Sequence, residues 1–338
     1  MAQNQRGLAI LMVLLIVALL TTILAYAAES QLILMRRVTN QKMLEQSYQL
    51  AMGAEQWIIN VLYEDLENEE TQKTDHKQEV WNSLGETVNV QGGSVTVTVS
   101  DLSGVFNLNS LFLDKTKNKK STKNFEAAVW VFNNLLLKLE LDTRLTGNLV
   151  DWMDTDDSDS PVQRSNGGGP LYIGGAEDFH YTGLSKPYRA ANQKLSSVGE
   201  LRFVKGFNQK AIKKLAPYVT VLPTTQLKIN VNTASEFLLE AMAKDFTVPP
   251  STMPDILAAQ QEEPWTRGKE LIEQSQAEWM PEVGRVIDVR SQFFMVTSEA
   301  SFGDLRYSMQ NILYREFDLD SSGKPQPAKV LKRERVLL

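Results

Sequence analysis

A dense run of aspartates lies near the middle of the chain. Five carboxylates share nine residues with no basic residue among them: Asp151, Asp154, Asp156, Asp157 and Asp159. Mutual repulsion makes such a group unfavourable unless it stays solvated or binds a cation. Hard oxygen ligands select calcium or magnesium, and calcium tolerates the irregular shell of six to eight oxygens that a loop can offer. The run therefore predicts either a calcium site or an exposed acidic loop.

The spacing of these aspartates is not that of an EF-hand. Residues 154–158 are not followed by the glycine that this loop needs at its sixth position, and Ser165 stands where its final glutamate belongs. A second acidic pair, Glu177 and Asp178, follows the glycine-rich stretches 167–169 and 174–175. Those glycines would let the chain fold back and bring this pair to the same cation.

The sequence gives little support for catalysis. The two histidines, His76 and His180, are not in a metal-ligand spacing, and no nucleophile elbow, phosphate loop or zinc-protease motif is present. Asp154 and Glu177 could in principle form the carboxylate pair of a hydrolase. We predict that the protein is not an enzyme and that His180 is structural.

The N-terminal segment is almost uncharged. Arg6 is the only charged residue among the first 28, and Gly7 and the apolar run Leu8–Ala28 follow it. A run of 21 residues is long enough to cross a bilayer as a helix. Three interpretations compete: a signal peptide cleaved near Ala27, a plain membrane anchor, and a prepilin peptidase site cut after Gly7.

The residues beyond the apolar run favour the third interpretation. Apolar residues continue at helical spacings as far as Leu62, and no proline occurs before Pro161. This pattern predicts one helix from about Leu8 to about Leu66, roughly 85–90 Å long. A pilin needs such continuity because its helices pack side by side in a filament, whereas a signal peptide does not. Arg6 also favours a cytoplasmic N-terminus with the bulk of the chain outside.

Composition is consistent with an exported protein. The chain has no cysteine, which excludes disulfides and thiolate metal sites. Its net charge is −6, whereas nucleic-acid phosphates favour a basic surface. A nucleic-acid partner is therefore unlikely on charge alone.

The remaining chain predicts an α+β fold. Alternating residues indicate strands at 87–90 and 94–100, and again at 293–301 and 306–317. Residues 106–109 could extend the first hairpin or begin a loop. About 170 residues between these β regions have helical periodicity, so a small antiparallel sheet is split by a helical insertion. The predicted helices cover residues 125–139, 200–203, 209–215, 236–244, 253–261 and 268–275.

A nucleic-acid motif must be weighed within this insertion. Residues 201–212 resemble a helix-hairpin-helix unit around Gly206, and residues 230–235 resemble the segment that opens such units in periplasmic DNA-uptake proteins. Asn208 replaces the usual second glycine, and residues 244–246 lack the expected turn. We favour a protein-interaction body, and a membrane-tethered periplasmic DNA-binding protein stays as the alternative.

Taken together, the motifs resemble the K-type minor pseudopilin of bacterial type II secretion systems over essentially the whole chain. The resemblance implies a pilin-like core with an inserted α-domain that binds Ca²⁺. It implies calcium ligands drawn from Asp154, Asp156, Asp159, Glu177 and Asp178. The motifs that carry it are Arg6-Gly7 with the apolar helix and residues 104–109, 151–156, 175–178, 200–202 and 230–234.

The resemblance also divides the chain into parts. It implies a leader peptide at 1–7, a transmembrane segment at 8–28, pilin-like helix and strands at 29–109, the inserted α-domain at 110–288, and C-terminal strands at 289–338. Cleavage would leave Leu8 as the first residue, N-methylated as in the family. The mature fifth residue would be Met12, where most pilins have a glutamate that pairs with a neighbour's terminal ammonium.

A subunit with nothing stacked above it needs no such glutamate. The implied function is structural: the protein caps and initiates the pseudopilus tip during export of folded proteins across the outer membrane. The implied location is the bacterial inner membrane, spanned once, with the bulk of the chain in the periplasm. The implied partners are I- and J-type minor pseudopilins, the major pseudopilin and the prepilin peptidase.

Overall fold

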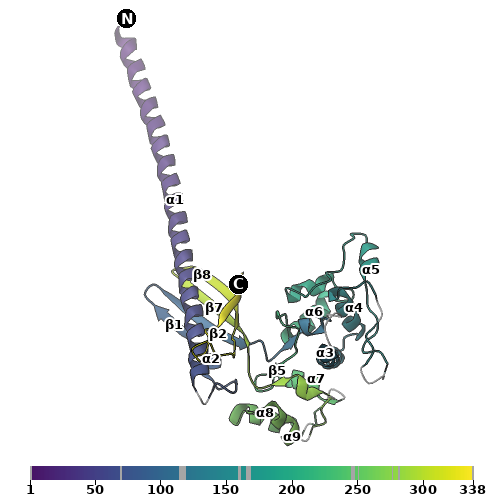
Figure 1. Cartoon of the computed structure of the whole chain (residues 1–338). Helices are drawn as coiled ribbons and strands as arrows, with labels where there is room; N and C mark the ends of the chain where they lie inside the picture. The colour runs from purple at the N-terminus through teal and green to yellow at the C-terminus, as the bar shows by residue number, and fades with distance from the viewer. Residues whose placement is uncertain are drawn as a thin grey trace.

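The fold combines one very long helix, a five-stranded antiparallel sheet and a helical insertion (Figure 1). It is the α+β fold that the sequence predicts. The computed structural model describes residues 2–68, 71–113, 119–158, 161–164, 169–244, 248–249, 251–275, 277–280 and 282–336.

Helix α1 (Ala2–Glu67) contains 66 residues and is about 100 Å long. Its N-terminal half stands clear of the rest of the molecule (Figure 1), and its apolar side chains from Leu8 to Val38 are exposed. Within the described residues, α1 is the one helix long and apolar enough to span a membrane. Its second half lies on the sheet, where Ala51, Ile58 and Leu62 are completely buried. The predicted continuous helix is therefore confirmed.

The sheet has the strand order β1-β2-β7-β8-β9, and every neighbouring pair is antiparallel. Four of its strands match the predicted β segments. Alternation places Val97 of β2 and Val296 of β7 on the buried face against α1. The strands are β1 (Thr87–Val90), β2 (Gly93–Asp101), β7 (Phe293–Phe302), β8 (Leu305–Tyr314) and β9 (Lys329–Val336).

The fifth strand, β9, was not predicted. Its basic and acidic side chains hide the β pattern, and such charges are typical of an exposed edge strand. Arg333 fixes this strand to α1, because its Nε and Nη2 atoms each donate a 2.7 Å hydrogen bond to the Glu55 carboxylate. Glu55 is buried, so the ion pair joins the last strand to the long helix.

The insertion leaves the sheet after β2 and returns before β7. Strand β3 (Phe106–Asn107) pairs in parallel with β4 (Val219–Thr220), and β5 (Ile229–Asn230) pairs in parallel with β6 (Ile287–Asp288). Strand β2 ends at Asp101, and β3 pairs within the insertion just before the predicted boundary at residue 109. The predicted division into domains stays a prediction.

Short helices fill the insertion, and one helix precedes β1. They are α2 (Val80–Ser83), η1 (Leu108–Leu111), α3 (Lys119–Lys138), α4 (Arg144–Met153), α5 (Asp178–Thr182), η2 (Val198–Phe203), α6 (Gln209–Leu215), η3 (Ala216–Tyr218), α7 (Glu236–Met242), α8 (Met253–Glu262), α9 (Gly268–Gln274) and η5 (Val283–Arg285). Apolar residues from the whole insertion form one buried core. The predicted helices are present, and α4 and α5 were not predicted.

The insertion contains two similar modules. In the first, the Asn109 side chain bonds to the backbone N–H and C=O of Leu195. In the second, the Asn232 side chain forms the same two hydrogen bonds with the backbone of Trp265. Each asparagine follows a short parallel strand and ends an Asn-x-Asn segment, at 107–109 and 230–232. Both segments therefore hold a later loop through the same pair of side-chain hydrogen bonds. The acidic run lies in the first module.

Candidate metal centre

Three buried carboxylates meet between α4 and α5. Asp151, Asp154 and Glu177 each offer an oxygen, and these oxygens lie within 4.8 Å of one another. Asp151 lies in the last turn of α4, Asp154 follows that helix as its C-cap, and Glu177 is the N-cap of α5. Calcium–oxygen bonds are about 2.4 Å long, so oxygens held by one ion lie at most about 4.8 Å apart. The size and the all-oxygen donor set of this group therefore fit calcium.

Two glycines bring the loop before α5 back onto α4. A Cβ atom on Gly147 would lie 1.9 Å from the carbonyl oxygen of Ile173, and one on Gly175 would lie 2.3 Å from the Gly147 backbone. The Gly175 N–H donates a 3.0 Å hydrogen bond to Asp151 Oδ2. This close backbone contact is possible only without side chains, and it places Glu177 beside the two aspartates.

The electrostatics of this group favour a bound cation. Burial raises the pKa of the Glu177 carboxyl to about 8, with the nearby negative charges of Asp151 and Asp154 adding to the effect. Glu177 is 7% exposed, and neither of its carboxylate oxygens has a hydrogen-bond partner among the described residues. A buried polar group without such a partner is costly, and a divalent cation would remove that cost.

The structure brings two of the five predicted ligands, Asp154 and Glu177, into one group. It adds Asp151, whose i, i+3 spacing from Asp154 would have indicated a shared face if α4 had been recognised. Asp156 is half-buried, and its charge contributes to the raised pKa of Glu177. Asp159 lies outside the described residues.

Asp178 has a different environment from Glu177. Its Oδ1 atom accepts a 2.7 Å hydrogen bond from the Ala190 N–H, and its Oδ2 atom lies 3.8 Å from Arg189 Nε. As the first residue of α5, Asp178 is directed to the 189–190 segment, while Glu177 reaches α4. The structure therefore does not place the predicted ligand Asp178 in the carboxylate group.

Aromatic side chains hold α5 against α4. The rings of Trp152 and Tyr181 are 5.0 Å apart and edge-to-face, and those of Tyr181 and Tyr188 are 5.4 Å apart. Burial raises the pKa of Tyr181 to about 12, and its hydroxyl accepts a hydrogen bond from the Lys205 N–H. This packing holds α5, whose N-cap is Glu177, against α4.

Lys205 belongs to the hairpin at residues 201–212 that resembles a DNA-binding unit, and its N–H is already bonded to Tyr181. Gly206 has a φ of +83°, as a tight hairpin requires. The amides around it are used inside the protein: Phe207 donates to the Val204 carbonyl, and Asn208 donates to the Gly206 carbonyl. A phosphate would have to compete with these bonds, so the geometry favours a structural hairpin.

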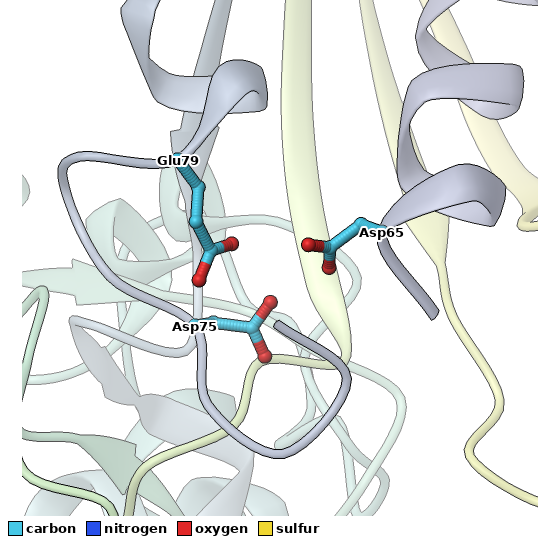
Figure 2. A group of neighbouring side chains, drawn as sticks. All are labelled: Asp65, Asp75 and Glu79. Atoms are coloured by element: carbon cyan, nitrogen blue, oxygen red, sulfur yellow. The ribbon is translucent and has the colours of Figure 1, made fainter. Parts of the chain in front are cut away.

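A second group of carboxylates lies where α1 ends. Asp65 comes from α1, whereas Asp75 and Glu79 come from the segment that leads to α2, and their carboxyl groups face one another (Figure 2). Arg315 is almost fully buried between them. Its Nη1 donates a 2.6 Å bond to Asp65 and its Nη2 bonds to Asp75. The guanidinium already pairs with two of the three carboxylates, so this group is an ion-pair junction.

One cation does not balance three carboxylates. Burial raises the pKa of Asp75 to about 6, and Arg315 opposes that rise. Burial, together with Asp75 and Asp65, raises the pKa of Glu79 to about 9. Glu79 therefore holds a proton at neutral pH.

The junction also fixes the insertion. The Asn230 side chain in β5 donates to the Asp75 carbonyl at 2.9 Å and to Ser291 Oγ at 2.7 Å. Ser291 Oγ in turn donates to Asp101 at the end of β2. The Asn-x-Asn segment at 230–232 thus joins the helical insertion to the pilin-like sheet.

These features define a class of protein. A long apolar helix that continues onto an antiparallel sheet is the architecture of a pilin-like subunit, here with a large insertion. The family model for type II secretion system (T2SS) protein K matches residues 104–224. The chain belongs to the protein K family of type II secretion systems, and it is a minor pseudopilin of that pathway.

Individual relatives agree with this assignment. The type II secretion system protein K of Pseudomonas aeruginosa is 31% identical over 339 residues, covering 99% of this chain and 94% of the relative. The type II secretion system protein K of Aeromonas hydrophila is 30% identical, and the match covers 94% of this chain and 95% of that relative. The fold is similar to a chain of the GspK-GspI-GspJ complex from enterotoxigenic Escherichia coli, with a TM-score of 0.69, 24% identity, and coverage of 89% of this chain and 100% of that one.

Proposed function

We propose that this minor pseudopilin caps and initiates the pseudopilus from the inner membrane, with its folded part in the periplasm. The insertion carries this proposal, because it extends well to one side of α1 (Figure 1). Subunits stacked helically around α1 would collide with such a body, whereas a terminal subunit has room for it. Met12, where an acidic residue would be expected, supports the same position. The role is structural, with no catalytic step.

The tip position predicts how the protein assembles. Overproduced full-length chain without other pseudopilins is expected to remain in the membrane as small species, because the insertion blocks repeated stacking. Electron microscopy of sheared cell surfaces would test this. A control strain overproducing the major pseudopilin should give long filaments. Long homofilaments of this chain would contradict the proposal.

The proposed partners are the I- and J-type minor pseudopilins, followed by the major pseudopilin. The solved structure with the same fold is a chain of a complex with I and J subunits, which supports the first two. The alternative of a DNA-binding protein is disfavoured by the net charge of −6 and by the use of the hairpin amides within the protein.

We also propose that Asp151, Asp154 and Glu177 bind Ca²⁺. The observation that carries this proposal is the fit of three buried carboxylate oxygens within 4.8 Å. Calcium would neutralise the group and tie the loop before α5 to α4. The ion would therefore stabilise one end of the insertion and leave the α1–sheet unit unaffected.

Processing by the prepilin peptidase gives a second prediction. We expect the mature protein to begin at Leu8 with a methylated amino group, and Gly7→Val to leave an uncleaved, membrane-inserted form that does not support secretion. Mass spectrometry of the N-terminal peptide measures both. Ala9→Val, two residues beyond, should be processed normally. A mature start at Ala28 or Glu29 would instead identify a signal peptide.

A further inference from the structure

The part of α1 that follows the apolar run Leu8–Ala28 carries two adjacent arginines, Arg36 and Arg37. We propose that these arginines bind the phosphate groups of anionic phospholipids on the outer face of the membrane that α1 spans. This inference rests on the membrane location in the proposed function and adds a lipid-binding site to it. The ligand is a lipid head group with a net negative charge, and phosphatidylglycerol is the probe.

Neither arginine has an acidic partner within the part of the chain that the structure describes. Both side chains are exposed, and no ion pair joins either of them to another described residue. The nearest carboxylates along α1 are Glu29, seven residues before Arg36, and Glu45, eight residues after Arg37. Side chains on a helix pair across three or four residues, so both glutamates are too far away. The two guanidinium groups are therefore available to a ligand.

The direction of α1 turns both arginines toward the membrane. Cα–Cβ bonds in an α-helix tilt toward its N-terminus, and the N-terminal part of α1 is the part that is apolar enough to lie in lipid. Arg36 lies about 12 Å beyond Ala28 along the helix. The head-group layer outside the hydrocarbon core is about 5–8 Å thick on each side. An arginine side chain that extends back along the helix can therefore reach the phosphates, as arginines near the ends of membrane helices do.

The residues just before the arginines suit a lipid environment better than a protein contact. Residues 32–35 are Leu, Ile, Leu and Met, and all four side chains are exposed. Four consecutive residues cover every side of a helix, because one turn takes 3.6 residues. A single partner helix cannot cover all of them, whereas lipid surrounds a helix. The arginine stems can pack on this apolar surface while their charged ends bind phosphate.

A third cation strengthens the positive charge of this segment. Lys42 is also exposed, and Met43 beside it lies against Gly303 in the turn between β7 and β8. Lysine and arginine are usually more frequent on the cytoplasmic side of a membrane span, so three cations on the outer side call for a reason. An anionic membrane surface supplies one, because it attracts basic residues close to it. Lipid bound at Arg36 and Arg37 would fix the depth of α1 and hold the sheet at a set height above the membrane.

The test uses the full-length chain in mild detergent, titrated with phosphatidylglycerol or with the zwitterionic phosphatidylcholine. Native mass spectrometry counts the bound lipids, and the wild type is expected to bind phosphatidylglycerol at least about tenfold more tightly. Arg36→Gln combined with Arg37→Gln should lose this preference, whereas Arg36→Lys combined with Arg37→Lys should keep most of it because lysine retains the charge. Lys210→Gln combined with Lys213→Gln removes two exposed cations of α6 and should bind like the wild type.

The depth of the helix gives a second measurement. The chain has no cysteine, so Ile33→Cys introduces a single site for an environment-sensitive dye. The neutral quencher acrylamide should reach this dye less in phosphatidylcholine vesicles that contain phosphatidylglycerol than in vesicles of phosphatidylcholine alone. Adding Arg36→Gln and Arg37→Gln should remove the difference. A dye at Gln41→Cys, beyond the arginines, should be quenched to a similar extent in both kinds of vesicle.

The outcomes separate this site from the proposed function. Equal binding of the two lipids by the wild type, or an unchanged preference in the glutamine variant, would overturn the lipid site and leave the proposed function standing. Carbonate extraction of cell membranes tests the location itself, and release of the wild-type chain as a soluble protein would overturn both. The glutamine variant should stay in the membrane fraction, because residues 8–28 are long enough to span the bilayer without the arginines.

Discussion

Arg315→Met is expected to lower the free energy of unfolding by about 3–5 kcal/mol at neutral pH, because it leaves the buried Asp75 and the partly buried Asp65 without their cation. Chemical denaturation of the full-length chain in detergent, followed by circular dichroism, measures this loss. Arg306→Met removes an exposed arginine from β8, the strand that ends just before Arg315, and should change stability by less than about 0.5 kcal/mol. Equal stability of the two variants would show that the junction does not hold the fold.

The effect should depend on pH in a defined direction. The folded-state pKa of Asp75 is about 6, above its ordinary value of 3.8, so ionisation of Asp75 costs stability as the pH rises from 3.8 through 6. Without Arg315 that pKa would rise further and the cost would grow. The difference between variant and wild type is therefore expected to be smallest in acid and largest above pH 6. Adding Asp75→Asn to Arg315→Met should recover part of the loss.

This junction could not be predicted from the sequence. Arg315 lies 240 residues beyond Asp75, and the two meet only because β8 ends beside the turn that follows α1. Local pattern carries no signal for such a contact. The long helix and four of the five strands were predictable because their apolar residues repeat with the period of the element.

Specific features of α4 explain why the sequence did not predict this helix. Helix α4 has only ten residues, and Gly147 in its middle normally argues against a helix. The structure shows that this glycine is needed for contact with the loop at Ile173. Because α4 was missed, Asp151 was recognised as acidic but not as a neighbour of Glu177.

Calcium is expected to raise the unfolding midpoint of the full-length chain by roughly 3–5 °C when present at about a hundredfold excess over its Kd. A ligand that binds only the folded state stabilises it by about 2.7 kcal/mol at that excess, and each kcal/mol shifts the midpoint by about 1–2 °C for a chain of 338 residues. Thermal unfolding after chelator treatment, with and without added calcium, measures the shift. Magnesium should stabilise less, because it gives up its waters reluctantly for an irregular site.

Four variants separate the proposed ligands from their neighbours. Asp154→Asn and Glu177→Gln should each abolish the calcium shift, whereas Asp157→Asn removes an exposed carboxylate of the same loop and should keep it. Asp178→Asn should also keep the shift if its carboxylate serves only the Ala190 amide. Loss of the shift in Asp178→Asn would restore this residue to the ligand set.

The backbone contact that positions Glu177 can be tested in the same assay. Gly147→Ala places a methyl group against the Ile173 carbonyl, so the loop must move and the calcium shift should be lost. Gly199→Ala is the matched control, because the nearest heavy atom lies 3.6 Å from its added Cβ. Both variants should retain the α1–sheet unit, since both residues lie in helices of the insertion.

The pH dependence of calcium binding provides the last and most specific test. Glu177 has a pKa of about 8 without a cation, so at neutral pH calcium must displace its proton. Calcium affinity should therefore increase as the pH rises from 6 to 8, and the increase should level off above 8. The stability of the cation-free protein should change in the opposite direction. It loses stability as the pH rises from 4.5 through 8, because ionised Glu177 then lies uncompensated beside two aspartates. Calcium titrations at pH 6, 7 and 8 measure the first effect, and unfolding in chelator measures the second. Equal midpoints with and without calcium at every pH, together with no bound calcium in elemental analysis, would leave Glu177 as a buried, protonated structural residue.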